Sequence, residues 1–161
     1  MIIQLRLIFG TILILLFGSL SVVAQSTKAK QAFYSAMAGN NVAVWNQQLE
    51  AVKNFKGNNK TAFEGALLMR KSSVLKVPAQ KLSTFKQGYK LLESSIAKEP
   101  KNVEYRFLRL MIQENAPKIV GYNKNLSEDS KLIKEGYKLL SAEAQQAILA
   151  YSKQSKTLTG L

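Results

Sequence analysis

Residues 82–100 read LSTFKQGYKLLESSIAKEP, and the spacing of their apolar residues is what most favours a helical fold. Large apolar residues recur every three or four positions, which is the spacing of one face of an α-helix. They are Leu82, Phe85, Tyr89, Leu92 and Ile96. We expect this face to lie in the core, with Lys86 and Lys90 pointing away from it. Gly88 lies mid-helix, where glycine costs about 1 kcal/mol relative to alanine, so we expect a neighbouring helix to approach closely there.

The pentapeptide GYKLL occurs twice, at residues 88–92 and at residues 136–140 within IKEGYKLLSAE. The second copy predicts another helical apolar face, made by Ile133, Tyr137, Leu140, Ala144 and Ile148. A weaker third instance is FEGALLM at residues 63–69, with Gly65 at the glycine position. The helical spacing is enough to explain the Tyr and Leu residues of both copies as core residues. The repeat therefore indicates a structural unit of paired helices, stacked as in an α-solenoid, and not a functional motif.

The segment GYKLLESSIAKEP (88–100) resembles the second helix of a tetratricopeptide (TPR) repeat. Gly88, Leu92 and Ser95 stand at the small, large and small positions of that helix, and Pro100 closes it. The Trp-Leu-Gly-Tyr pattern of the first TPR helix is absent, and the spacing of the two copies exceeds the usual repeat of about 34 residues. The resemblance implies an all-α fold of antiparallel helix pairs, a TPR-like short α-solenoid. A plain helical bundle is the alternative.

The rest of the chain also has helical character. The spacing of apolar residues predicts helices over residues 29–38, 42–55 and 102–115. A capping box of Thr61 and Glu64 predicts the start of a helix that ends near Pro78. Ser127, followed by two acids, is the predicted N-cap of a last helix or helix pair. Residues 154–161 are then expected to fray.

Residues 1–24 have the organisation of a secretory signal peptide. One cation, Arg6, precedes a long apolar run, and Val22 and Ala24 lie just before polar residues at a plausible cleavage site. The apolar run approaches the length of a spanning helix, so an uncleaved membrane anchor is the alternative. We expect an exported protein, in the periplasm or outside the cell, whose residues 25–161 form a single all-α domain.

The chain is strongly basic, with 23 Lys and Arg against 10 Asp and Glu and a net charge of +13. Removal of residues 1–24 takes away only Arg6, which leaves +12. An exported protein meets no genome, so we expect no nucleic-acid partner. Anionic envelope components, lipid headgroups and acidic proteins are the expected partners, and a membrane would be contacted only by the signal peptide or by surface charge. Alternatively, the lysines serve only to keep the surface solvated.

Neither cysteine nor histidine occurs in the chain. Their absence excludes disulfides, thiol nucleophiles, imidazole acid–base catalysis and metal sites built on Cys or His. We expect no metal site and no cofactor. A hydrolase that uses two carboxylates is the enzyme class that remains, but Glu99, Glu104 and Glu114 form no recognisable catalytic arrangement. The composition therefore favours a protein that is not an enzyme.

The segment PKNVEYRFLRLMIQENAP (100–117) carries the candidate site. Apolar residues cover most of its helix, but polar residues at offsets of four, three and four form one stripe. This stripe consists of Asn102, Arg106, Arg109 and Gln113. Two of the three arginines of residues 25–161 belong to it, and the planar guanidinium suits paired hydrogen bonds with carboxylate or phosphate.

Two interpretations of the stripe stay open. In the first, both guanidinium groups pair within the chain and join helices. The candidate partners are Glu64, Glu93 and Glu104. In the second, Arg106 and Arg109 line a groove that receives an acidic peptide or an anionic headgroup. Tyr122 and Asn123, in the loop after this helix, are then candidates for the rim of the site, although Tyr122 also suits a place over the core.

The motif E-x-R-F-L-R at residues 104–109, followed by A-P-x-x-x-G-Y at residues 116–122, resembles a pattern of secreted helical proteins from bacteroidete bacteria. The resemblance implies export in a Gram-negative cell and brings no activity. We predict an exported, non-catalytic helical binding protein, a periplasmic protein–protein interaction module. One alternative is a basic envelope-surface protein that binds anionic lipid or polysaccharide, and another is a carboxylate-based hydrolase.

Overall fold

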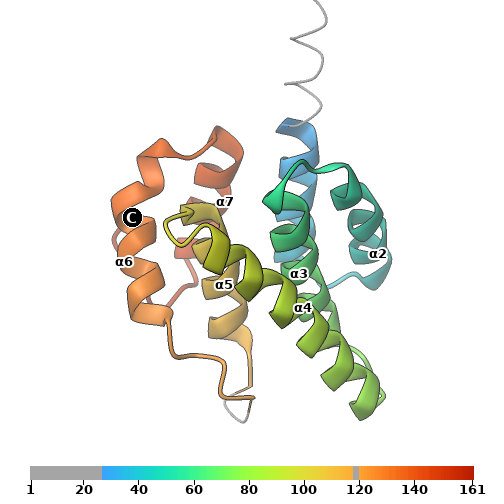
Figure 1. The fold of residues 1–161 in the computed structure, drawn as a ribbon. Coiled ribbons are helices and arrows are strands. Elements are labelled where there is room, and N and C mark those ends of the chain that lie inside the picture. The colour runs from blue at the N-terminus through green and yellow to red at the C-terminus, as the bar shows by residue number, and fades with distance from the viewer. Residues whose placement is uncertain (1–26, 118–119) are drawn as a thin grey trace, which may run out of the picture.

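The computed structural model describes residues 27–117 and 120–161, and this part of the chain is helical without any β-strand. Residues 27–38 form the first described helix, drawn in blue in Figure 1. It is followed by α2 (Val42–Ala51), the 3-10 turn η1 (Val52–Asn54), α3 (Asn58–Ser72), α4 (Pro78–Lys98), α5 (Val103–Asn115), α6 (Leu126–Gly136), the 3-10 turn η3 (Tyr137–Leu139) and α7 (Ala142–Ser152). The prediction of an all-α fold is confirmed.

The predicted signal peptide, residues 1–24, and its alternative as an uncleaved anchor lie outside the described residues. From residue 27 to 117 and from 120 to 161, no helix combines the length and the apolar composition needed to cross a bilayer.

Helices α3 and α4 form an antiparallel pair, seen as the long green to yellow-green hairpin in Figure 1. The start of α3 meets the end of α4, where Asn58 Nδ2 donates to the carbonyl oxygen of Ser95 at 2.9 Å. At the crossing, Gly65 and Gly88 face each other. A Cβ on Gly88 would lie 2.5 Å from the carbonyl oxygen of Gly65, and a Cβ on Gly65 would lie 2.7 Å from that of Gly88. The close approach predicted at Gly88 is confirmed.

Helices α5 and α6 form a second antiparallel pair. Gly136, at the end of α6, packs on Val103 at the start of α5, so closely that a Cβ on the glycine would overlap Val103 Cγ2. Arg109, in the middle of α5, bonds Asp129 in the first turn of α6. The prediction of antiparallel helix pairs is therefore confirmed, and the second glycine of the repeat also marks a close contact.

The two GYKLL copies nevertheless adopt different structures. The first lies inside α4, but in the second Gly136 ends α6 and Tyr137–Leu139 form a 3-10 turn. Leu140 is extended, with ψ of 162°, and Leu139 is 90% exposed. The prediction of one continuous helical face through the second copy is wrong, because the chain turns there to begin α7.

The apolar face predicted for α4 is only partly in the core. Leu92 and Ile96 are buried, whereas Leu82 is 54% and Tyr89 is 44% exposed. Helix α3 approaches α4 on the side that carries Gly88 and Leu92, so the side that carries Leu82 and Tyr89 remains uncovered. The prediction that these two residues belong to the core is wrong.

Two helix starts also differ from those predicted. Helix α3 begins at Asn58 after Gly57, whose φ of 59° suits glycine, and so the proposed capping box at Thr61 lies inside the helix. It ends at Ser72, well before Pro78. Helix α6 begins at Leu126 with Asn125 as N-cap, so Ser127 lies within its first turn.

One core joins both helix pairs and reaches the C-terminus. Its centre is a group of packed aromatic rings, in which Phe33 lies 4.4 Å from Phe63 between centroids. Leu158 belongs to the same core and is fully buried. The tail is also bound by Glu114, whose Oε1 accepts from Ser155 Oγ at 2.9 Å and from the N–H of Thr157 at 3.0 Å. The prediction that residues 154–161 fray is wrong.

Candidate binding cleft beside helix α5

Helix α5 is the central element of the candidate site. It begins after Asn102, whose side-chain oxygen accepts from the N–H groups of Glu104 and Tyr105 at 3.1 and 3.2 Å. This is the N-cap geometry that asparagine favours. Almost the whole helix is buried, including three residues of the polar stripe: Arg106, Arg109 and Gln113. The stripe therefore faces other helices, and Asn102 serves as a cap.

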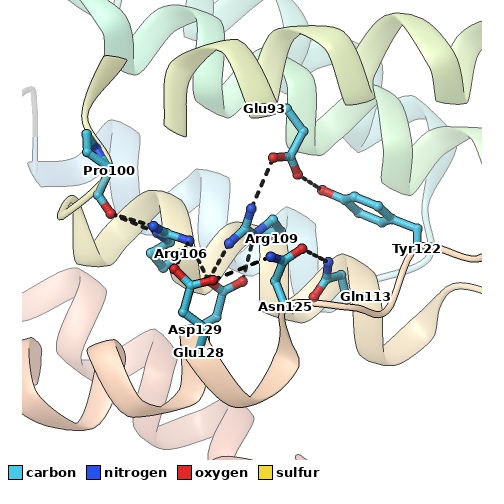
Figure 2. A network of polar contacts seen from close by, with 9 residues as sticks. All are labelled: Glu93, Pro100, Arg106, Arg109, Gln113, Tyr122, Asn125, Glu128 and Asp129. Atoms are coloured by element: carbon cyan, nitrogen blue, oxygen red, sulfur yellow. Dashed lines mark hydrogen bonds and ion pairs between the residues drawn. The ribbon is translucent and has the colours of Figure 1, made fainter. Parts of the chain in front are cut away.

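The carboxylate of Asp129, on α6, is fully buried between the two arginines (Figure 2). Arg109 Nε donates to Asp129 Oδ2 at 2.7 Å, and Arg109 Nη2 donates to Oδ1 at 2.6 Å. Arg106 Nη1 donates to the same Oδ1 at 3.1 Å. The bidentate contact of Arg109 is the geometry for which a guanidinium is better suited than an ammonium.

Further acceptors surround both guanidinium groups. Arg106 Nε and Nη2 donate to the carbonyl oxygen of Pro100 at 2.9 and 2.7 Å, and Arg106 Nη1 lies 3.1 Å from Glu128 Oε1. Arg109 Nη1 donates to Glu93 Oε2 on α4 at 3.0 Å. Burial by itself lowers the pKa of Arg109, but its hydrogen bond to Asp129 and the charges of Asp129 and Glu93 raise the pKa above its usual value.

The two arginines thus pair within the chain, as the first interpretation of the stripe supposed. Of the three predicted partners, only Glu93 is used, while Glu104 binds Lys30 and Tyr34 instead. Asp129 and Glu128 were not predicted as partners. The sequence does contain a feature that points to them, the two consecutive acids at the start of α6. Because α6 packs antiparallel to α5, these acids lie beside the two arginines.

Tyr122 connects this network to the surface. Its hydroxyl donates to Glu93 Oε1 at 2.5 Å, so one carboxylate joins Tyr122 to Arg109. Burial, and then the hydrogen bond to Glu93 and its charge, raise the pKa of Tyr122 well above the usual value, so the hydroxyl stays a donor. Tyr122 therefore lies over the core as well as in the candidate site, while the predicted rim residue Asn123 is exposed.

A cleft of about 310 Å³ opens beside these residues. Helix α4 contributes Phe85, Tyr89 and Glu93, α5 contributes Gln113, and the loop contributes Val120, Gly121, Tyr122, Lys124 and Asn125. The ring of Tyr122 meets those of Phe85 and Tyr89 edge to face, with centroids 5.8 and 5.3 Å away. The structure thus brings two predicted site residues, Gln113 and Tyr122, into one cleft with an aromatic wall.

Gln113, which lines this cleft, has an unused acceptor. Its Nε2 donates to Asn125 Oδ1 at 3.3 Å. Its Oε1 is buried and accepts no hydrogen bond from any residue in the described part of the chain. An unpaired buried carbonyl costs about 1–3 kcal/mol, so a donor group that reaches this oxygen would recover part of that cost.

A second hollow lies between α6 and the C-terminal segment. It has a volume of about 620 Å³ and is lined by Leu126, Ser127, Ser130, Lys131, Lys134, Glu135 and Thr157. Although it is larger, Ser130 Oγ on its wall already donates to the carbonyl oxygen of Thr157 at 2.7 Å. The cleft beside α5 is the better candidate because it combines aromatic walls with an unused acceptor.

Comparison of the chain with protein-family models, curated proteins and solved structures found no match. Function must therefore be inferred from the cleft, the surface and the sequence. Among the described residues, no group of three or more Asp or Glu side chains is placed to hold a metal ion.

Proposed function

We propose that the chain is an exported, non-catalytic helical binding protein that acts in the periplasm or outside the cell as a protein–protein interaction module. Its binding site is the cleft between α4, α5 and residues 120–125. The observation that carries this proposal is the unpaired Gln113 carbonyl oxygen beside an aromatic wall. The antiparallel helix pairs support a TPR-like architecture, in which proteins bind partners along helix surfaces.

The size and chemistry of the cleft indicate what it binds. A volume of about 310 Å³ is at the low end for a small-molecule site, and it suits one or two side chains of a partner protein. Phe85, Tyr89 and Tyr122 offer apolar ring surface, Gln113 accepts from an N–H group, and Lys124 adds a cation at the rim. The expected ligand is a protein segment with an apolar or aromatic side chain, a free backbone N–H and a nearby acid.

The arginine stripe then acts through its neighbours. Arg109 fixes Glu93, and Glu93 fixes the hydroxyl of Tyr122. Tyr122 in turn packs edge to face on the rings of Phe85 and Tyr89. In this proposal, Arg106 and Arg109 keep the cleft in shape and do not touch the partner.

Site-specific photocrosslinking in cells tests this function. A photoreactive phenylalanine analogue replaces Tyr89 or Val120, two exposed residues that line the cleft from α4 and from the loop. The controls carry the same analogue at Leu139 or Leu149, which are exposed apolar positions that do not line the cleft. Both cleft positions should form an adduct with the same protein, and the controls should not.

A substitution at Gln113 makes the test more specific. Gln113→Leu keeps the approximate volume of the side chain but removes the acceptor, so it should weaken the adduct formed from Tyr89. Thermal unfolding of the variant shows whether its fold is retained. If the cleft positions give no adduct, or the same adducts as Leu139 and Leu149, the proposed function is wrong.

A further inference from the structure

The hairpin formed by α3 and α4 has an unusual charge. Between Glu64 and Glu93 the sequence has no acidic residue, but it has six basic ones. They are Arg70, Lys71, Lys76, Lys81, Lys86 and Lys90. The last four are exposed, in the turn of the hairpin and along α4. This is the longest stretch of the described chain that contains basic residues and no Asp or Glu.

Exposed aliphatic side chains accompany these lysines. Val74, Val77 and Leu82 are 41%, 48% and 54% exposed, although each is large and apolar. Val74 and Val77 lie in the turn between the helices, and Leu82 lies in the second turn of α4. Figure 1 shows that this end of the hairpin projects beyond the other helices, at the lower right of the view. The tip is therefore convex, basic and apolar at once.

We propose that the tip of the α3–α4 hairpin docks on the surface of an anionic lipid bilayer. Val74, Val77 and Leu82 would enter the boundary between headgroups and acyl chains, and Lys76, Lys81 and Lys86 would contact lipid phosphates. Interfacial proteins bind by this combination of a small apolar surface and flanking cations.

Charge and shape favour a bilayer over an acidic protein. A protein partner of a convex apolar tip would need a matching cavity, whereas a bilayer deforms around it. The cations are lysines, which act as point charges toward many headgroup arrangements and lack the fixed fork of arginine. Because no carboxylate lies between residues 65 and 92, a continuous anionic surface meets no local repulsion along the hairpin.

Vesicle binding tests the proposal with matched variants. The protein is purified from cells that express the full chain, and mass spectrometry defines its N-terminus, which all variants share. Sedimentation with phosphatidylcholine vesicles, with and without phosphatidylglycerol, gives the affinity. The hairpin variant Lys76→Gln/Lys81→Gln/Lys86→Gln should bind anionic vesicles at least about tenfold more weakly than wild type.

The control variant is Lys131→Gln/Lys134→Gln/Lys138→Gln, which removes three exposed lysines from α6 and η3 and gives the same net charge. It should bind within about twofold of wild type. A second pair of variants measures how much the exposed apolar side chains contribute to binding. Val77→Ser/Leu82→Ser should weaken binding about tenfold, whereas Leu139→Ser/Leu149→Ser should not. Circular dichroism confirms that each variant is folded.

Equal losses in the two lysine variants would overturn the proposal, because they would show diffuse attraction to net charge. Wild-type binding by the hairpin variants, or no binding of the wild-type protein, would overturn it too. The outcome is independent of the cleft: a protein adduct from Tyr89 and Val120 supports the interaction module whether or not the hairpin binds vesicles.

Discussion

At the scale of single residues, Asp129 has the largest role in the polar network. Its carboxylate is fully buried and binds the guanidinium groups of Arg106 and Arg109. Taking charges out of water is expensive, and close pairing with several hydrogen bonds offsets that cost. Removing the acid leaves two buried cations with fewer partners, which costs more than the pair contributes when it is intact.

Asp129→Asn should therefore lower the free energy of unfolding by about 3–5 kcal/mol, as measured by urea denaturation. The control is Glu50→Gln, the same change of charge at an exposed acid that pairs with exposed Lys53. That pair should contribute less than about 1 kcal/mol. Similar small losses in both variants would contradict a stabilising role for the buried network.

The sequence identified the stripe but not all of its partners. Offsets of four, three and four placed Arg106, Arg109 and Gln113 on one helix face, and Glu93 was among the candidate acids. Asp129 could not be selected, because its contact depends on which helix packs on α5 and in which register. The unpaired oxygen of Gln113 is a consequence of tertiary structure alone, so no local pattern could reveal it.

At the scale of elements, each helix pair depends on a glycine, but in different ways. At the α3–α4 crossing the backbone of Gly88 meets the backbone carbonyl of Gly65. At the α5–α6 contact the backbone of Gly136 meets the side chain of Val103. A side chain can be shortened by mutation, whereas a backbone carbonyl cannot, so the two contacts can be told apart experimentally.

Gly88→Ala should destabilise the protein by about 1–3 kcal/mol, although alanine is the better helix former, because the new Cβ would force the helices apart. Gly136→Ala should be destabilising as well, and adding Val103→Ala should restore part of the loss. Adding Met69→Ala to Gly88→Ala should restore less, because the carbonyl of Gly65 remains. Urea denaturation measures all four variants.

The matched control for the α4 substitution is Gln87→Ala, an exposed neighbour of Gly88 on the same helix. It should change stability by less than about 0.5 kcal/mol. A neutral Gly88→Ala would show that the helices separate at no cost, and would contradict the close crossing.

The repeated pentapeptide shows the limit of local sequence at this scale. Both copies have the same five residues, and both glycines lie at helix contacts. The first copy continues as helix to Lys98, but the second is followed by Ser141, which is extended and precedes α7 as its N-cap. Helical periodicity therefore predicted the elements well, but it could not show where α6 ends, nor which side of α4 would lack a neighbour.

At the scale of the whole molecule, the helical spacing of apolar residues predicted the fold class. It did not predict that the C-terminal tail would be ordered. Residues 154–161 are mostly polar and have no periodicity. They are ordered by a distant side chain: Glu114 Oε1 accepts from Ser155 Oγ, from Thr157 Oγ1 at 2.8 Å and from the N–H groups of Lys156 and Thr157. The two contacts from backbone N–H groups require no particular side chain, so the sequence of the tail does not reveal them.

The buried side chain of Leu158 makes the contribution of the tail measurable. Leu158→Ala should lower the free energy of unfolding by about 2–5 kcal/mol, because it opens a cavity in a core that extends to Phe33 at the other end of the chain. Leu139→Ala, the same substitution at a side chain that is 90% exposed, should cost less than about 0.5 kcal/mol. Urea denaturation compares the two. If both variants unfold at the same concentration of urea, the tail detaches in solution and the core ends with α7. A clear difference means that the tail packs in the core and contributes to the stability of the helices.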